Sequence, residues 1–211
     1  DDKGVVVSIW PWSDDPFTRA ERLDVYTGRR TPIARAPVRN ADFTTDNLGQ
    51  VRFAHGAGIG NARKLYYRDG KGSDWQLVND EAVSKRAEHP LGFNRDQTIA
   101  YLQVEQASGP DAVVAWNIAT GERKEVLRNP NVDPDSIVYS QDSDMVPVGV
   151  VFADGKPSVR FFADDVPEAR LYRSLEAAFP GEVVKVTSRT ADGKLALVQV
   201  SSDRNPGDFY L

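Results

Sequence analysis

The stretch HPLGFNRDQTIAYLQVEQASGPDAVVAWNIATGERKEVLRN, residues 89–129, decides the fold class of this chain. It divides into four short runs of apolar and β-branched residues, at 89–96, 98–106, 112–122 and 123–129. Turn-forming residues separate the runs, as at Ser108-Gly109-Pro110-Asp111 and at Thr120-Gly121. Asp side chains bond to the backbone that follows them and Gly adopts positive φ, so these clusters favour turns. The stretch therefore predicts four strands joined by short turns.

The same unit recurs along the chain. Each copy has an aspartate in its first turn, and the steps between these aspartates are 50, 46 and 50 residues. They are Asp46, Asp96, Asp142 and Asp192. Repeats of about this period indicate a solenoid, an array or a propeller, and four-stranded units arranged radially form a β-propeller. We predict an all-β fold, a partial β-propeller of about four to five four-stranded antiparallel blades.

The repeat also predicts the organisation of the chain. We expect one partial propeller domain over 1–211, with blade-like units at approximately 1–40, 41–85, 86–132, 133–182 and 183–211. The first unit has three candidate strands, and the last is incomplete because its third run is Phe209-Tyr210-Leu211. We therefore expect the chain to be part of a larger protein. Unfinished blades expose strand edges, so we expect the chain either to form an open arc or to close by self-association through those edges.

One segment departs from the strand pattern. Leu171, Leu175 and Ala178 are spaced i, i+4 and i+7, which is the spacing of one helical face. Pro167 suits a first helical turn, and Pro180-Gly181 ends a helix. We predict one inserted helix near 168–178 in an otherwise all-β chain.

Composition excludes several functions. The net charge is −5 with both signs interspersed, so no basic face for nucleic acid is expected. The chain has no Cys, which excludes a disulfide, a thiolate nucleophile and a zinc–thiolate site. The apolar runs are too short to span a bilayer, so no membrane partner is expected. Both a cytoplasmic and a periplasmic location stay open.

The closing stretch VTSRTADGKLALVQVSSDRNPGDFYL, residues 186–211, resembles the last propeller blade of the prolyl oligopeptidase family of serine peptidases. It is most similar to bacterial acylaminoacyl-peptidase and dipeptidyl-aminopeptidase-like members. The residues that match the family line, with Ser188 one position off register, are Asp192, Gly193, Val198, Ser201, Asp203, Pro206, Gly207, Tyr210 and Leu211.

This resemblance implies a serine peptidase as the parent protein, with the reacting residues in a C-terminal α/β-hydrolase domain. The propeller would cap the active site and limit or orient peptide substrates. The chain itself contains no G-x-S-x-G nucleophile motif, and its histidines, His55 and His89, have no neighbours in sequence that would make either a base. We therefore expect no catalytic residue here. The alternative is a stand-alone TolB-like propeller that binds a protein or a ligand.

Three local patterns could suggest a cofactor, a metal or a carboxylate pair. Gly56-Ala57-Gly58-Ile59-Gly60 follows a predicted strand, but a strand follows it where a dinucleotide loop requires a helix. The run Asn131-x-Asp133-x-Asp135, with Asp142, lacks the Gly and the Glu of a calcium loop. The recurring aspartates lie on different blades, whereas a glycosidase needs two carboxyls in one pocket. We expect no cofactor and no metal, and the substrate-binding residues stay unassigned.

Aromatic and arginine residues leave alternatives open. Packing between blades is expected for the tryptophans, and the first two could instead form a loop at the rim of the pore. The four are Trp10, Trp12, Trp75 and Trp116. Arg189 and Arg204 flank turns of the last unit; each could hold a peptide carboxylate, although a surface ion pair is expected.

Overall fold

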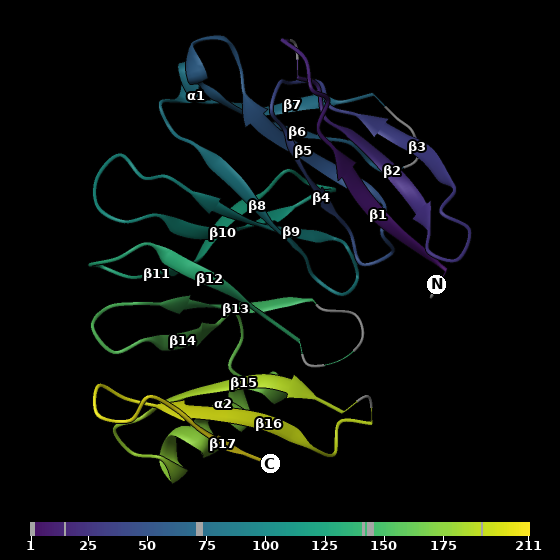
Figure 1. The fold of residues 1–211 in the computed structure, drawn as a ribbon. Coiled ribbons are helices and arrows are strands. Elements are labelled where there is room, and N and C mark those ends of the chain that lie inside the picture. The colour runs from purple at the N-terminus through teal and green to yellow at the C-terminus, as the bar shows by residue number, and fades with distance from the viewer. Residues whose placement is uncertain (1–2, 15, 71–73, 141, 143–145, 191) are drawn as a thin grey trace. The chain divides into compact units, whose positions relative to one another are not determined.

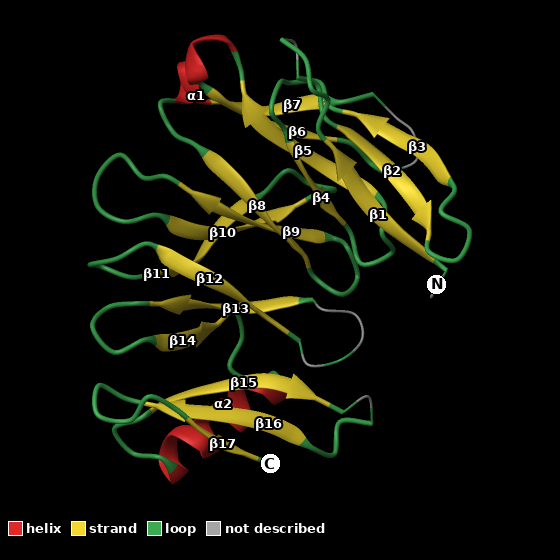
Figure 2. Cartoon of the chain, in the orientation of Figure 1, coloured by secondary structure: helices red, strands yellow, loops and turns green. Residues whose placement is uncertain are grey.

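The structure, a computed structural model, describes residues 3–14, 16–70, 74–140, 142, 146–190 and 192–211 (Figure 1). Strands dominate these residues, as Figure 2 shows. They form five sheets, each built from strands that are consecutive in the chain. This repetition of small sheets confirms the predicted all-β fold.

Two sheets have four strands. One contains β4 (Asp42–Thr45), β5 (Val51–Ala57), β6 (Arg63–Tyr67) and β7 (Gln76–Asp80). The other contains β8 (Glu88–Phe93), β9 (Ile99–Val104), β10 (Ala112–Asn117) and β11 (Arg123–Arg128). The short 3-10 helix η1 (Ile59–Asn61) follows β5, and the short helix α1 (Glu81–Ser84) follows β7.

Within the described residues, the other three sheets have three strands each. The first contains β1 (Gly4–Ile9), β2 (Arg19–Asp24) and β3 (Arg30–Arg35). The second contains β12 (Pro134–Tyr139), β13 (Pro147–Phe152) and β14 (Ser158–Phe161), and the third contains β15 (Val183–Arg189), β16 (Ala196–Ser201) and β17 (Asp208–Tyr210). The sheet β12–β14 is followed in the chain by the helix α2 (Pro167–Ala178), in the unit where the sequence predicted a departure from the four-strand pattern.

Along strand β9, buried residues alternate with less buried ones, as expected for a strand with one face in the core. In β9 every second residue, from Ala100 to Val104, is buried, and the residues between them are half-buried. Successive side chains of a strand point to opposite faces of the sheet, so this period of two places one apolar row in the core.

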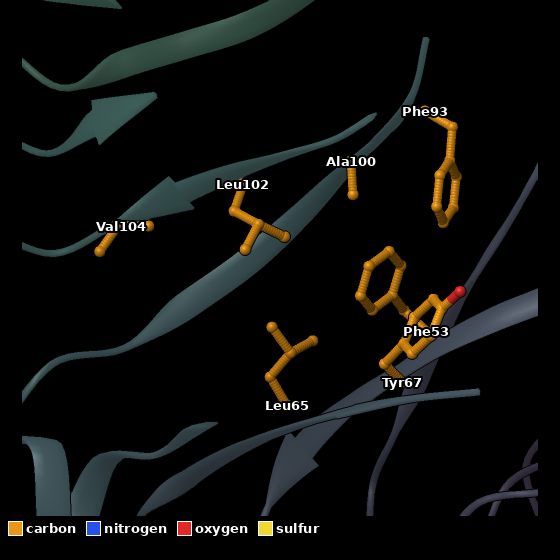
Figure 3. Close-up of a cluster of buried hydrophobic side chains, with 7 residues drawn as sticks. All are labelled: Phe53, Leu65, Tyr67, Phe93, Ala100, Leu102 and Val104. Carbon is orange, nitrogen blue, oxygen red and sulfur yellow. The ribbon is translucent and has the colours of Figure 1, made fainter. Parts of the chain in front are cut away.

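The residues group into two compact units, Asp1–Ser108 with Val113–Lys124, and Gly109–Ala112 with Glu125–Leu211. The core of the first unit lies between two sheets. Phe53 of β5 is fully buried, and its ring stacks on Phe93 of β8 with centroids 5.2 Å apart. Figure 3 shows side chains of β5 and β6 pointing toward those of β8 and β9. Aromatic pairs at this distance add to the free energy of burial, so this cluster holds the two sheets face to face.

The core of the second unit joins the inserted helix to the last sheet. Tyr172 of α2 is buried against β15 and β16, and Leu171 and Leu175 pack on the same cluster. The helix begins at Pro167, and its last backbone bond runs from the Phe179 N–H to the Leu175 carbonyl. The predicted helix is confirmed, although α1 is a second helix that the pattern did not predict.

An equivalent turn joins the first strand to the second in four of the sheets. The first residue of the turn accepts a backbone N–H of the same turn on its side-chain oxygen, at 2.9, 2.9, 2.9 and 3.1 Å. The residues in this position are Asp46, Asn94, Ser140 and Thr190. A short side chain with an oxygen is all that the position requires, so four residue types fill it.

These bonds correct the register of the repeat. The structural counterpart of Asp46 is Asn94, whereas Asp96 lies two residues further on, in the position of Asp142 and Asp192. In those two later turns the aspartate accepts a hydrogen bond from the hydroxyl two residues before it, at 2.7 Å. The aspartates therefore belong to two different turn positions, and both positions serve turn geometry.

Candidate functional site

The second unit contains a groove of about 690 Å³ between two of its sheets. Residues from the start to the end of β12 line one side of the groove, and residues from the start to the end of β15 line the other. Both strands are the first of their sheets and are labelled in Figure 1. The helix α2 also contributes, through Tyr172 and Glu176. A concave site of this size is typical of ligand pockets.

Two strand edges border the groove. In the described part of the chain, β12 pairs only with β13, and β15 pairs only with β16. One backbone N–H of β15 already has a partner, because the Val186 N–H donates to the Tyr172 hydroxyl at 3.3 Å. Both strands also have register shifts, at Val138/Tyr139 and at Val186/Ser188. Unpaired backbone at a strand edge is a ready acceptor of another strand.

The lining of the groove combines apolar and charged side chains. Val138, Val184 and Val186 form its buried apolar part. Its acidic side chains are Asp135, Asp142, Glu176 and Glu182, and its basic side chains are Lys156, Lys185 and Arg189. The Arg189 Nε donates to the Gly193 carbonyl at 3.1 Å, so this guanidinium is held at the turn that follows β15.

Two tyrosines of the groove are held neutral. Burial raises the pKa of the Tyr172 hydroxyl and also that of Tyr139. For Tyr172 the hydrogen bond from Val186 lowers the pKa and the charge of Glu176 raises it, in that order of size after burial. Burial disfavours the ionised phenol, so both groups act as hydrogen-bonding groups and apolar walls.

The two histidines meet in the first unit. His55 of β5 and His89 of β8 contact edge to face, with ring centroids 5.5 Å apart. Arg63 Nη1 lies 3.1 Å from His89 Nε2, and Asp42 Oδ2 lies 4.0 Å from His55 Nε2. Burial lowers the pKa of His55, and His89 and Arg63 lower it further while Asp42 opposes them. The sequence did not show this pairing, because the partners come from different sheets.

The glycine run at 56–60 joins two strands of one sheet. After β5 the chain passes through η1 directly into β6, so the glycine run 56–60 forms a hairpin connection. A Cβ at Gly56 would lie 2.5 Å from the Arg39 carbonyl, which shows why glycine stands there. Among the described residues no cluster of three or more His, Cys, Asp or Glu could hold a metal ion.

Residues of the acidic run near 131–135 form hydrogen bonds to other loop residues. Asn131 donates to Asp154 Oδ2 at 2.9 Å, and Asp133 accepts the Asp111 N–H at 2.7 Å. Asp135 instead lines the groove. These residues therefore point to different partners and do not converge as calcium ligands do.

The four tryptophans differ in packing and exposure. Trp116 packs on Phe53 and Tyr67, and Trp75 stacks on Phe43 with centroids 6.3 Å apart. Trp10 is half-exposed and Trp12 is fully exposed. Of the two arginines, Arg189 lines the groove, and Arg204 is exposed.

The sequence did not identify the groove. Glu182, one of its acidic residues, follows the helix-ending Pro180-Gly181, and Tyr172 and Glu176 were predicted only as parts of an inserted helix. The sequence feature that could have indicated the groove was the position of that helix between two blade units. The inserted helix follows a three-stranded sheet and packs on the next sheet.

Repeated small antiparallel sheets and a groove along first strands define a partial β-propeller. The solved structure of TolB from Acinetobacter baumannii matches this chain with a TM-score of 0.52 and 10% sequence identity. The match covers 97% of this chain and 50% of the TolB chain, so the chain spans about half the length of that structure. At this identity the likeness shows the fold.

No sequence-family profile and no curated protein matches the chain. In the described residues, none of the helices has the length and apolar character needed to cross a membrane.

Proposed function

We propose that this chain is a TolB-like binding propeller whose groove between β12 and β15 receives an extended segment of another protein. The observation that carries this proposal is the groove itself, about 690 Å³ in volume and bordered by two strand edges. An extended peptide that adds to a sheet edge gains affinity from main-chain hydrogen bonds and specificity from pockets for alternate side chains. The apolar wall at Val138, Val184 and Val186 supplies such a pocket.

The likeness to TolB supports this reading at the level of fold. His55 and His89 contact each other, and Arg63 Nη1 lies beside His89 Nε2. The proposal needs no chemistry from the chain, only a preformed surface.

A selection from a displayed library of random dodecapeptides on the purified chain tests the proposal. The variant Ser136→Trp places a large side chain on an exposed position of β12 inside the groove. Selected peptides should bind this variant at least about tenfold more weakly, because the groove is filled. The matched control Ala177→Trp adds the same bulk to an exposed position of α2 that does not line the groove. Equal affinity for both variants, or no selected peptide, would refute the proposal.

A second candidate function rests on the last blade. The residues 186–211 that resemble the prolyl oligopeptidase family fold as β15, β16 and β17, with the turn at Asp192-Gly193 between the first two strands. In this reading the chain is the non-catalytic propeller of a serine peptidase, partnered by a C-terminal α/β-hydrolase domain of the same parent and limiting its peptide substrates.

The coding sequence beyond Leu211 discriminates between the two candidates. A G-x-S-x-G motif followed by Asp and His supports the peptidase parent. The isolated chain should not hydrolyse aminoacyl or acyl-peptide chromogenic substrates in either case. Turnover by the purified chain would contradict both functions.

A further inference from the structure

We infer that the groove is specific for a segment that carries a basic side chain, and that Glu182 is the residue that selects it. This inference rests on the proposed function and names the chemistry of the ligand. Its structural basis is one atom: Glu182 Oε2 is buried and has no hydrogen-bond partner among the described residues. Glu182 lines the groove.

The position of Glu182 is set by the end of the helix. Its backbone N–H donates to the Phe179 carbonyl at 3.2 Å, which places the residue immediately before β15 begins at Val183. Glu182 thus lies where the edge of β15 starts. A segment added to this edge would pass this residue.

An unpaired buried carboxylate oxygen is costly. A buried polar group without a partner loses the hydrogen bonds it made to water, and the loss is larger for a charged group. A guanidinium or an ammonium from a ligand would restore those bonds, and charge-assisted bonds of this kind are the strong ones. Binding would therefore remove an unfavourable contribution that the free chain carries.

The other charges of the groove are consistent with a basic ligand. Besides Glu182, the acidic side chains that line the groove are Asp135, Asp142 and Glu176, and the basic ones are Lys156, Lys185 and Arg189, so acidic side chains outnumber basic ones by one. In the described residues no ion pair joins any of these basic side chains to Glu182. An acidic ligand would leave the Glu182 oxygen unsatisfied, so the geometry favours a cation.

A segment fits the groove better than a small amine does. A free amine would engage the carboxylate alone, whereas the groove extends along both strands and is bordered by their unpaired edges. Main-chain pairing with such an edge requires an extended chain on both sides of the basic residue. We therefore assign the occupant as an extended peptide segment with a Lys or Arg near its middle.

Three synthetic nonapeptides test the inference by fluorescence anisotropy. Each is acetylated, amidated and built of alternating Thr and Val, with Arg, norleucine or Glu at the centre. The chain should bind the Arg peptide at least about tenfold more tightly than the norleucine peptide, the range expected for a hydrogen bond to a charged group. It should bind the Glu peptide most weakly.

The variant Glu182→Gln keeps the shape and removes the charge. It should lose the preference for Arg while binding the norleucine peptide within about twofold of the unchanged chain. Glu125→Gln is the matched control, because Glu125 is exposed on β11 and does not line the groove. Should Glu182→Gln fail to fold, the three peptides on the unchanged chain still decide the question.

The outcomes separate this inference from the proposed function. Equal affinity for all three peptides, still lost in Ser136→Trp, would overturn the basic specificity and keep the binding groove. No binding of any peptide would overturn both. Competition by free arginine amide as strong as by the Arg peptide would overturn the assignment to an extended segment.

Discussion

Arg52 of β5 and Asp46 of the turn that follows β4 form a buried ion pair, with Arg52 Nη1 3.0 Å from Asp46 Oδ2. The carboxylate side chain is fully buried and the guanidinium nearly so. The same guanidinium donates to the Tyr67 hydroxyl, and its Nε donates to the Arg68 carbonyl at 3.1 Å. One pair therefore joins the repeated turn to the core of its sheet.

Removing one partner of this pair should strongly lower the free energy of unfolding. In Asp46→Ala the Arg52 charge stays buried without its partner, and the turn amides of Leu48 and Gln50 lose their acceptor. We expect a loss of about 3–5 kcal/mol in the free energy of unfolding. Urea unfolding followed by circular dichroism measures it. Asp192→Ala is the matched control at an exposed turn, where a much smaller loss is expected because solvent screens the charge.

The core between β5 and β8 predicts a second result. Phe53→Ala removes a fully buried ring that contacts Phe93, Tyr67 and Trp116. The cost should be about 3–5 kcal/mol, since the ring leaves a cavity as well as losing its burial. Phe209→Ala, at a ring that is 60% exposed, is the control. A similar loss in both variants would contradict the assignment of Phe53 to the core.

The histidine pair predicts a dependence of stability on pH. Burial lowers the pKa of His55 below its ordinary 6.5 in the folded chain. The unfolded chain then binds the proton more readily, so the stabilisation is complete above pH 6.5 and is lost as the pH falls from there toward the folded pKa. Urea unfolding at pH 7.5 and 5.5 should show this slope.

The variant His55→Gln should reduce that slope. Asp42→Asn should steepen the slope, because the charge of Asp42 favours protonated His55. A slope that is unchanged in His55→Gln would show that other groups are responsible for the pH dependence.

The outer edge of β17 predicts self-association. It is the last strand of its sheet in the described residues, and Phe209 and Leu211 are exposed there. Exposed apolar strand edges pair with other strands. Light scattering should show oligomers that grow with concentration, and Phe209→Lys should reduce them because charge on an edge opposes pairing. A monomer at all concentrations would contradict this expectation.

The local structure could be predicted from local patterns. The turn at Tyr26-Thr27-Gly28-Arg29 matches the one at 119–122 in its bonds: Asp24 Oδ1 and Asn117 Oδ1 each accept two turn N–H groups at 2.9–3.1 Å. The helix α2 followed from its apolar spacing and its flanking prolines. Such features depend on residues within a few positions of each other, which is the range that sequence patterns describe.

The register of the repeat and the site could not be predicted in the same way. An alignment by identical residues pairs Asp46 with Asp96. In the structure this turn position is filled by Asp, Asn, Ser or Thr, and the residue equivalent to Asp46 is Asn94. The contact of His55 with His89 joins strands of different sheets. The groove beside Glu182 depends on how the inserted helix meets the last sheet.

By itself the sequence determined an all-β chain of repeated small sheets, with one helix near 168–178, because turn chemistry and side-chain periodicity act over a few residues. Only the tertiary structure decided which residues face one another: Phe53 on Phe93, His55 on His89, and Glu182 in a groove between β12 and β15. Those contacts arise from the packing of sheets far apart in the chain, and burial is a property of that packing.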